Sequence, residues 1–272
     1  MKVTTDLVGA RLDPAHFNVI KRFVFDAAGI HLADTKHALV SGRLGKRLRA
    51  HAFTRYDDYL RLLATDRAEA QIALDLLTTN ETYFYREPQH FEFLRDTILP
   101  GRVRGQMFRA WSAACSSGEE PYSVAMTLAD ALGDAAWEVI GTDISSRVLE
   151  KARAGRYPLD RAHHIPRDAL HRHCLKGIGP EEGQLLIAKP LRQRVRFLHA
   201  NLNASLPDVG IFDLILLRNV MIYFQPETKR SLIERLATHL RPGGWLFIGH
   251  SESLTGLTER LIQVRPAIYR KP

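Results

Sequence analysis

Residues 108–123 read FRAWSAACSSGEEPYS, and the rest of the chain is organised around them. The first five residues are mostly apolar or small, which is typical of a buried strand. A loop of small residues follows, and a helix is predicted from Glu119, because Pro121 suits a first turn that needs no backbone N–H. Strand, tight loop and helix in this order form the nucleotide site of doubly wound α/β folds.

The loop departs from the phosphate-binding pattern G-x-G-x-x-G, because Gly118 is its only glycine. Glu119 and Glu120 stand where a pyrophosphate-binding loop presents bare N–H groups. Acids here fit a ligand without phosphates, such as S-adenosylmethionine, which carries hydroxyls, an ammonium and a sulfonium. The alternative is that both acids only complement the helix dipole.

The chain has 272 residues, 45% of them hydrophobic, which is enough for one large domain or two ordinary ones. No apolar run approaches the ~20 residues of a membrane helix. The beginning of the chain carries Asp6 and Asp13 and lacks a signal-peptide core, so we expect a cytoplasmic protein without membrane insertion. Only two cysteines are present and no histidine pair has metal-binding spacing, so we expect neither disulfides nor a metal.

The formal net charge is +8. This sign favours an anionic partner, either a nucleic acid or an acidic protein surface, and composition cannot choose between them.

Residues 1–78 are predicted to form an all-α domain. Its four helices are expected to begin at Asp13-Pro14, Asp34-Thr35, Thr54 and Asp66. An acid three residues after each of the last two starts, Asp57 and Glu69, resembles a capping box.

The second of these helices is predicted to run to Ala50 with an almost wholly cationic polar surface. Its basic residues are Arg43, Lys46, Arg47 and Arg49. Such a run is either a solvated face or a docking surface for an acidic partner.

Residues 79–87 are too aromatic for an idle linker, and Arg86 follows three aromatic residues, so it is expected to line a site. Pro88 then opens a helix that should end near Pro100-Gly101, and a domain from 88 to 272 follows. A second parallel strand, Trp137 to Asp143, ends in an acid 25 residues after Gly118. An acid at this position accepts hydrogen bonds from ribose hydroxyls, although Asp143 also suits the N-cap of the next helix.

From about 155 to 194 the βαβ pattern is interrupted. Strand-like segments at Gln184–Ala188 and Val195–His199, with turn residues around them, predict a small antiparallel insert. The α/β pattern then resumes with a buried strand at 212–217, a helix from Pro226 to near Leu240, a strand from Trp245 to Gly249 and a final strand from Gln263 to Tyr269. An antiparallel hairpin ending a parallel sheet is typical of Rossmann-like methyltransferases.

Four motifs in this order resemble the CheR family, the chemotaxis receptor glutamate O-methyltransferases. They are Asn80-x-Thr82-x-Phe84-Tyr85-Arg86, the stretch from Ser112 to Ser123, Thr142-Asp143-Ile144, and Arg218-Asn219-Val220-Met221-Ile222-Tyr223-Phe224. The resemblance covers nearly the whole chain, and the only departures are small residues of the loop, Cys115 and Ser117.

The resemblance implies an all-α domain followed by a Rossmann-like class I methyltransferase domain with an inserted β-subdomain, and S-adenosylmethionine as methyl donor. Carried over by motif, the cofactor-binding residues would be Asn80, Thr82, Arg86, Glu120, Asp143, Asn201, Leu202, Arg218 and Asn219. Arg86 and Tyr223 would be catalytic and would face the reacting carboxylate.

The implied partners are chemoreceptor cytoplasmic helices, docked on the cationic second helix, and the expected oligomeric state is a monomer. Some family members also grip an aromatic-containing peptide at the receptor C-terminus with the β-subdomain. Lys176, Arg192 and Arg194 are candidates here for its terminal carboxylate. The alternative is that the insert only covers a sheet edge.

Two rival functions are a nucleic-acid base methyltransferase and a non-catalytic receptor-binding adaptor. Enzymes that methylate a base amino group usually carry Asn-Pro-Pro-aromatic, where this chain has Arg218-Asn219-Val220-Met221. An adaptor would be favoured if Arg86 or Tyr223 were missing, and both are present. We therefore expect no nucleic-acid substrate.

Overall fold

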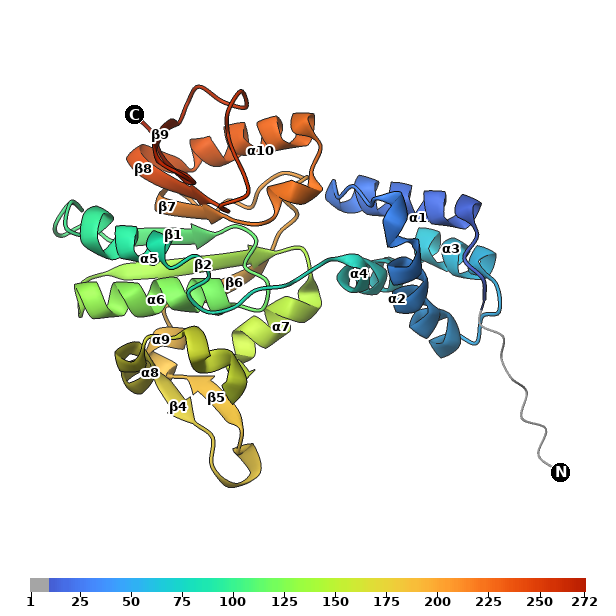
Figure 1. Ribbon diagram of the computed structural model, residues 1–272, viewed down its shortest axis with the longest axis horizontal. Helices are drawn as coiled ribbons and strands as arrows, with labels where there is room; N and C mark the ends of the chain where they lie inside the picture. The colour runs from blue at the N-terminus through green and yellow to red at the C-terminus, as the bar shows by residue number, and fades with distance from the viewer. Residues whose placement is uncertain (1–9) are drawn as a thin grey trace. The chain divides into compact units, whose positions relative to one another are not determined.

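The computed structural model describes residues 10–272, and the chain divides after Thr79 into two compact units (Figure 1). Residues 1–9, which include Asp6 of the segment searched for a signal peptide, lie outside the described residues. Within the described part, no helix is both long and apolar enough to cross a membrane.

The first unit is helical. Its elements are α1 (Pro14–Ala28), a 3-10 turn η1 (Asp34–Lys36), α2 (His37–Ala50), α3 (Tyr56–Thr65) and α4 (Arg67–Leu77). Ile20, Val24, Val40, Leu44 and Tyr59 are fully buried and form much of its core. Burial of a side chain of this size contributes roughly 1.5–3 kcal/mol, which is the main reason that these short helices persist.

Local capping signals explain where α1 and α4 begin. Asp13 accepts a hydrogen bond from the His16 N–H at 2.8 Å, and Asp66 accepts from the N–H groups of Ala68 and Glu69. The predicted capping box at Thr54 is wrong, because α3 begins at Tyr56 and its start has no side-chain cap.

Glu69 also departs from its predicted capping role. It accepts bonds from Arg47 Nε (2.8 Å) and Nη2 (2.5 Å), from Tyr59 Oη (2.8 Å) and from His51 Nε2 (3.0 Å), and its side chain is 3% exposed. Burial by itself raises the pKa of Glu69, but the bonds from Arg47, His51 and Tyr59 outweigh it and lower the pKa to about 2. A partly buried ion pair, with Glu69 as its buried member, therefore joins α2 to α4.

The second unit contains a seven-stranded sheet in the order β6-β2-β1-β7-β8-β10-β9. Its strands are β1 (Phe108–Ser112), β2 (Trp137–Asp143), β6 (Val195–His199), β7 (Phe212–Leu217), β8 (Leu240–Ile248), β9 (Ile262–Arg265) and β10 (Ile268–Arg270). The first five run parallel, and β10 is antiparallel to both β8 and β9. The connection reverses direction between β1 and β7, which makes their carboxyl ends a topological switch point.

The connecting helices are α5 (Gln89–Phe93), which continues into a π-helical turn (Leu94–Ile98), α6 (Glu119–Leu132), α7 (Ser146–Ala154) and α10 (Pro226–Thr238). Val124 and Leu128 of α6 pack with Val139, Leu214 and Phe247 of the sheet in one buried cluster. This confirms the strand–loop–helix unit predicted around Gly118.

Three strand predictions are corrected. Val195–His199 pairs in parallel with β2 in the main sheet and so lies outside the insert. The strand expected from Trp245 begins earlier, at Leu240. The single last strand is a hairpin, because the chain turns at Pro266-Ala267, where Ala267 has φ 61°.

The insert forms its own three-stranded antiparallel sheet in the order β3-β5-β4. Its elements are β3 (Arg156–Pro158), a 3-10 turn η3 (Leu159–His164), α8 (Arg167–His173), β4 (Cys174–Lys176), a 3-10 turn η4 (Gly179–Glu181), β5 (Gln184–Ile187) and α9 (Lys189–Arg192). Figure 1 shows β4 and β5 projecting from the main sheet, with their connecting loop at the tip.

The buried Glu69 cluster predicts a pH-dependent stability of the first unit. A lowered pKa means that the folded state favours the charged form, so this stabilisation is present above the ordinary pKa near 4.5 and disappears as the pH falls to about 2. Glu69→Gln should lower the free energy of unfolding by about 3 kcal/mol at pH 7. Amide hydrogen exchange of α2 and α4 across this pH range measures the loss.

The matched control is Asp58→Asn, which removes an acid from an exposed pair with Arg61 on α3. Exposed pairs contribute at most ~1 kcal/mol. Equal losses in the two variants, or a loss in Glu69→Gln that persists at pH 2, would contradict the assigned role of Glu69.

Candidate cofactor and methyl-transfer site

The candidate residues gather at one edge of the main sheet. Four neighbouring parallel strands contribute to this edge, in the order β6, β2, β1 and β7. Asn201 follows β6, and Asp143 is the last residue of β2. The loop after β1 leads to Glu120, and Arg218-Asn219 follows β7. Since the carboxyl ends of parallel strands meet at one edge, the fold brings these residues together from distant parts of the sequence.

The loop after β1 turns sharply at Gly118, where φ is 97°. A Cβ at this position would lie 2.8 Å from the Ala152 Cβ and 2.9 Å from the Tyr157 hydroxyl, so only glycine fits. The loop is held by Asp143, whose Oδ2 accepts from the Ser116 N–H at 2.9 Å. Asp143 thus lies directly beside the loop, as its place at the end of β2 predicts.

Asp143 also supports the start of α7. Its Oδ1 accepts from the N–H of Ser145, the N-cap residue of α7, at 2.9 Å. The ribose role and the structural role remain compatible, because each carboxylate oxygen can accept a second hydrogen bond.

The two acids of the loop have different surroundings. Glu119 is fully buried and bonded to the Ser117 hydroxyl and to Arg161 of η3, and burial raises its pKa. Glu120 accepts from the Ser112 hydroxyl at 2.6 Å through Oε1 and from Arg218 Nη1 at 2.8 Å through Oε2. Neither acid serves the helix dipole alone.

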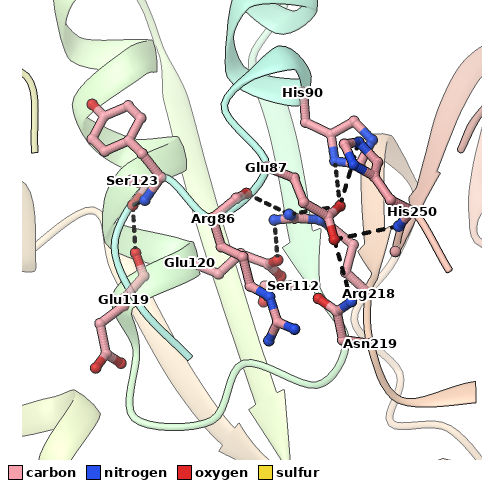
Figure 2. Close-up of polar contacts among 12 residues, drawn as sticks. Arg86, Glu87, His90, Ser112, Glu119, Glu120, Ser123, Arg218, Asn219 and His250 are labelled. Carbon is pink, nitrogen blue, oxygen red and sulfur yellow. Dashed lines mark hydrogen bonds and ion pairs between the residues drawn. The ribbon is translucent and has the colours of Figure 1, made fainter. Parts of the chain in front are cut away.

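Arg218 is the hub of the site (Figure 2). Its guanidinium pairs with Glu120 at 2.8 Å and with Glu87 Oε2 at 3.0 Å, and it donates to the backbone carbonyl of Arg86. The Arg218 side chain is 1% exposed, so both carboxylates neutralise a buried charge. Burial raises the pKa of Glu87, but the attraction of Arg218 is stronger and the net shift is downward.

Asn219, with φ 57°, is held on both its backbone and its side chain. Its backbone N–H donates to Glu252 Oε2 at 2.9 Å, and its Nδ2 donates to Glu87 Oε1 at 3.3 Å. Arg218 and Asn219 are thus fixed by three acids from three separate parts of the chain, Glu87, Glu120 and Glu252.

Arg86 and Tyr223 lie in segments that this network joins. Arg86 is half-buried, its Nη1 donates to the Glu81 carbonyl at 3.0 Å, and its guanidinium lies 5.7 Å from the centre of the Tyr83 ring. Tyr223 is half-buried at the end of a 3-10 turn, η5 (Met221–Tyr223), that follows Asn219. Arg218 connects the two segments, because it bonds the Arg86 carbonyl.

The remaining candidates line the same edge or the segment before α5. The Asn80 carbonyl accepts from the Ser116 hydroxyl at 3.0 Å, and Thr82 is buried. Asn201 Oδ1 accepts from the Asn203 N–H at 2.9 Å, and the carbonyl of the buried Leu202 accepts from Arg235 Nη2 at 2.6 Å. All nine cofactor-binding candidates belong to the second unit, in which residues 80–87 are packed.

Glu87, His90 and His250 form a group whose ligand atoms lie within 4.8 Å of one another (Figure 2). Burial lowers the pKa of His90 to about 3, so this ring is neutral, and it stacks on Phe247. The Glu87 carboxylate already pairs with Arg218, so a divalent cation would have to compete with a buried guanidinium. The donor set does not favour a metal centre.

Glu87, His250 and Glu252 were missed by reasoning from the sequence. Glu87 directly follows Arg86, and Glu252 lies in the polar run after β8, where the other strand-end residues gather. The position of Glu252 could have been predicted to lie at the site, because β8 is parallel to β7 and ends at the same edge of the sheet.

Two family comparisons agree with this geometry. Residues 15–78 match "CheR methyltransferase, all-alpha domain", and residues 80–269 match "CheR methyltransferase, SAM binding domain". S-adenosylmethionine (SAM) is therefore the cofactor of the second unit. The acids, amides and arginines that the second unit places around a loop with a single glycine fit a ligand without phosphates.

Curated relatives cover nearly the full chain. The chemotaxis protein methyltransferase of Escherichia coli is 42% identical over 95% of this chain and 91% of its own length. That of Salmonella typhimurium is 43% identical over 95% and 90%, and chemotaxis protein methyltransferase 2 of Pseudomonas aeruginosa is 39% identical over 93% and 91%. With both domains matched and the motif residues assembled at one sheet edge, this chain belongs to the CheR family of chemotaxis methyltransferases.

Proposed function

We propose that this methyltransferase esterifies glutamate side chains on the cytoplasmic helices of chemoreceptors, for sensory adaptation. The observation that carries the proposal is the joining of the Arg86 segment to the Asn219–Tyr223 turn through Arg218. A cation from Arg86 and a phenol from Tyr223 in these joined segments would face the acceptor carboxylate, which fits a chain of the CheR family of chemotaxis methyltransferases.

The chemistry asks little more of the protein. A glutamate carboxylate, with a pKa of about 4.3, is already ionised at neutral pH and needs no general base. When bound, S-adenosylmethionine supplies an activated methyl group. Arg86 and Tyr223 would orient the acceptor oxygen, which is the main requirement for an in-line transfer at near-attack distance.

The cofactor-binding roles follow from position. Asp143 at the end of β2 would accept from the ribose hydroxyls, while Asn80, Thr82, Asn201 and Leu202 would line the remainder of the pocket. Arg218 and Glu120 already bond each other, so we propose that they shape the site as much as they touch the ligand.

Transfer of a labelled methyl group from S-adenosylmethionine to receptor-rich membranes tests the proposal. We expect label on the receptor that alkali releases as methanol, because carboxyl esters are base-labile and N-methyl groups are not. Label on nucleic acid would favour a base methyltransferase instead, and cofactor binding without any transfer would favour an adaptor.

Tyr223→Phe should keep cofactor affinity and lose about 10- to 100-fold in kcat, since it removes the hydroxyl that orients the acceptor. The control is Tyr269→Phe, which alters a buried tyrosine of β10. A Tyr223→Phe rate equal to that of the parent at saturating receptor would remove Tyr223 from the catalytic assignment.

We also propose that α2 docks on the acidic receptor helices, but with a narrower set of residues than the sequence suggests. Lys46 and Arg49 are exposed and three residues apart, on one helical face. Arg43 instead donates to the carbonyls of Leu76, Leu77 and Thr78 at the end of α4, and Arg47 pairs with Glu69.

The proposed docking face of α2 also contains two glycines, Gly42 and Gly45, which have no side chains. A Cβ at Gly42 would meet no atom within 4 Å, and one at Gly45 would meet only Arg49 at 3.8 Å. Glycine inside an exposed helix costs roughly 0.5–1 kcal/mol relative to alanine. Two such positions beside two cations support close approach of a partner helix.

Lys46→Glu with Arg49→Glu should therefore raise the KM for receptor and weaken its salt dependence, because exposed charges are screened as the Debye length shortens from ~10 Å at 0.1 M to ~3 Å at 1 M salt. Arg61→Glu with Arg67→Glu, which changes the same charge on α3 and α4, is the control. The same KM in parent and variant at low salt would mean that Lys46 and Arg49 form only a solvated face and do not dock the receptor.

The insert is proposed to bind the receptor C-terminal peptide by strand addition. Its edge strand β4 exposes Leu175 and Lys176, and Ile178 at the loop tip is 82% exposed. Of the three candidate carboxylate receptors, Lys176 is the exposed one. Arg192 donates to the Ile187 carbonyl and Arg194 to the Ala135 carbonyl.

Receptor-tail peptides that end in an aromatic-containing motif should bind the full chain, and Lys176→Glu should weaken that binding. Tethering would raise the local enzyme concentration to the mM range. Lys151→Glu on α7 is the control for the change in charge. If no such peptide binds, the insert only covers a sheet edge and the catalytic assignment is unaffected.

A further inference from the structure

We propose that Glu252 is a positioning residue for methyl transfer, because its carboxylate holds the turn that carries Asn219 and Tyr223. The inference rests on the proposed function, in which Tyr223 orients the acceptor carboxylate. Glu252 comes from the loop after β8, outside every motif that identified the site in the sequence.

The first evidence is the bonding of Glu252. Its Oε2 accepts from the backbone N–H of Asn219 at 2.9 Å and from that of Gly249 at 2.7 Å. Burial raises the pKa of Glu252, and the backbone N–H groups that bond its carboxylate oppose that shift. One carboxylate oxygen therefore joins the start of the turn to the end of β8.

The second evidence is the backbone of Asn219. Its φ of 57° lies in the left-handed region, which a non-glycine residue keeps only when its surroundings hold it there. Glu252 holds the Asn219 backbone, and Glu87 Oε1 holds its side chain at 3.3 Å and the His250 N–H at 3.3 Å. Glu252 and Glu87, from two different segments, thus both hydrogen-bond Asn219.

The third evidence is the close approach of the end of β8. A Cβ at Gly249 would lie 2.5 Å from Asn219 Nδ2 and 2.9 Å from Glu252 Oε2. The absence of a side chain at Gly249 lets Glu252 reach the Asn219 amide.

A shift of Asn219 would be passed on to Tyr223. Between them lie only Val220 and the two preceding residues of η5, and the Tyr223 N–H donates to the Val220 carbonyl at 3.1 Å. Since a misplacement of about 1 Å can cost ~10²-fold in rate, holding this turn is a catalytic requirement even though Glu252 touches no substrate.

The test compares Glu252→Ala and Glu252→Gln with the parent. Glu252→Ala should lower kcat by about 10- to 100-fold and leave the receptor KM within about 2-fold. Glu252→Gln keeps one acceptor oxygen and should recover part of the rate. Glu259→Gln, at an exposed position of the same loop region, is the matched control and should match the parent.

A double-mutant cycle separates positioning from general loss of structure. If Glu252 acts by placing Tyr223, adding Glu252→Ala to Tyr223→Phe should cost less than about 3-fold, because coupled residues are not additive. Losses that multiply, or a change in KM alone, would overturn the proposal.

Amide hydrogen exchange supplies a readout that needs no activity. Glu252→Ala should speed exchange at Asn219 and Gly249 by about 10-fold or more and leave β7 (Phe212–Leu217) unchanged. Unchanged exchange in the turn would overturn the holding role itself. A parent that transfers no base-labile methyl group would instead overturn the proposed function, and the two failures are therefore distinguishable.

Discussion

The site depends on the burial of one guanidinium, that of Arg218, between two carboxylates. Removing an ion from water costs several kcal/mol, and only close, hydrogen-bonded partners offset that cost. Glu120 reaches Arg218 from the start of α6, and Glu87 from the segment before α5, where the Arg86 carbonyl also accepts. Because these partners come from separate parts of the chain, the charge is satisfied only when all three segments have reached their final places.

Backbone strain is concentrated around the same charge. Positive φ values occur at the non-glycine residues Tyr85 (52°), Glu87 (58°), Ser116 (48°) and Asn219 (57°). The N–H groups of three of them are held by side chains, namely Ser123 for Tyr85, Asp143 for Ser116 and Glu252 for Asn219. Such conformations persist only where the surroundings over-determine them, and a site held in this way needs little rearrangement when its ligand arrives.

Predictions from the sequence succeeded where the signal was local. The Asp66 cap and the strand, loop and helix around Gly118 follow from neighbouring residues, and the structure contains them. Thr54 failed as a cap because α3 begins two residues later, and Val195–His199 was grouped with the insert because its pairing with β2 is not local. Arg43 and Arg47 were counted as surface charge, since nothing near them in sequence indicates the α4 carbonyls or Glu69.

The sequence by itself determined the two-part organisation and the family and supplied the candidate site residues, because motifs and periodicity are written in consecutive residues. Only the tertiary structure decided which charges are buried and which acids hold which amides. Glu252 bonds Asn219 across 33 positions, and Arg218 bonds Glu87 across a far longer stretch of chain. The physical reason is that an ion pair or a hydrogen bond depends on distance and burial, which the sheet order sets when it brings β7 beside β1 and β8.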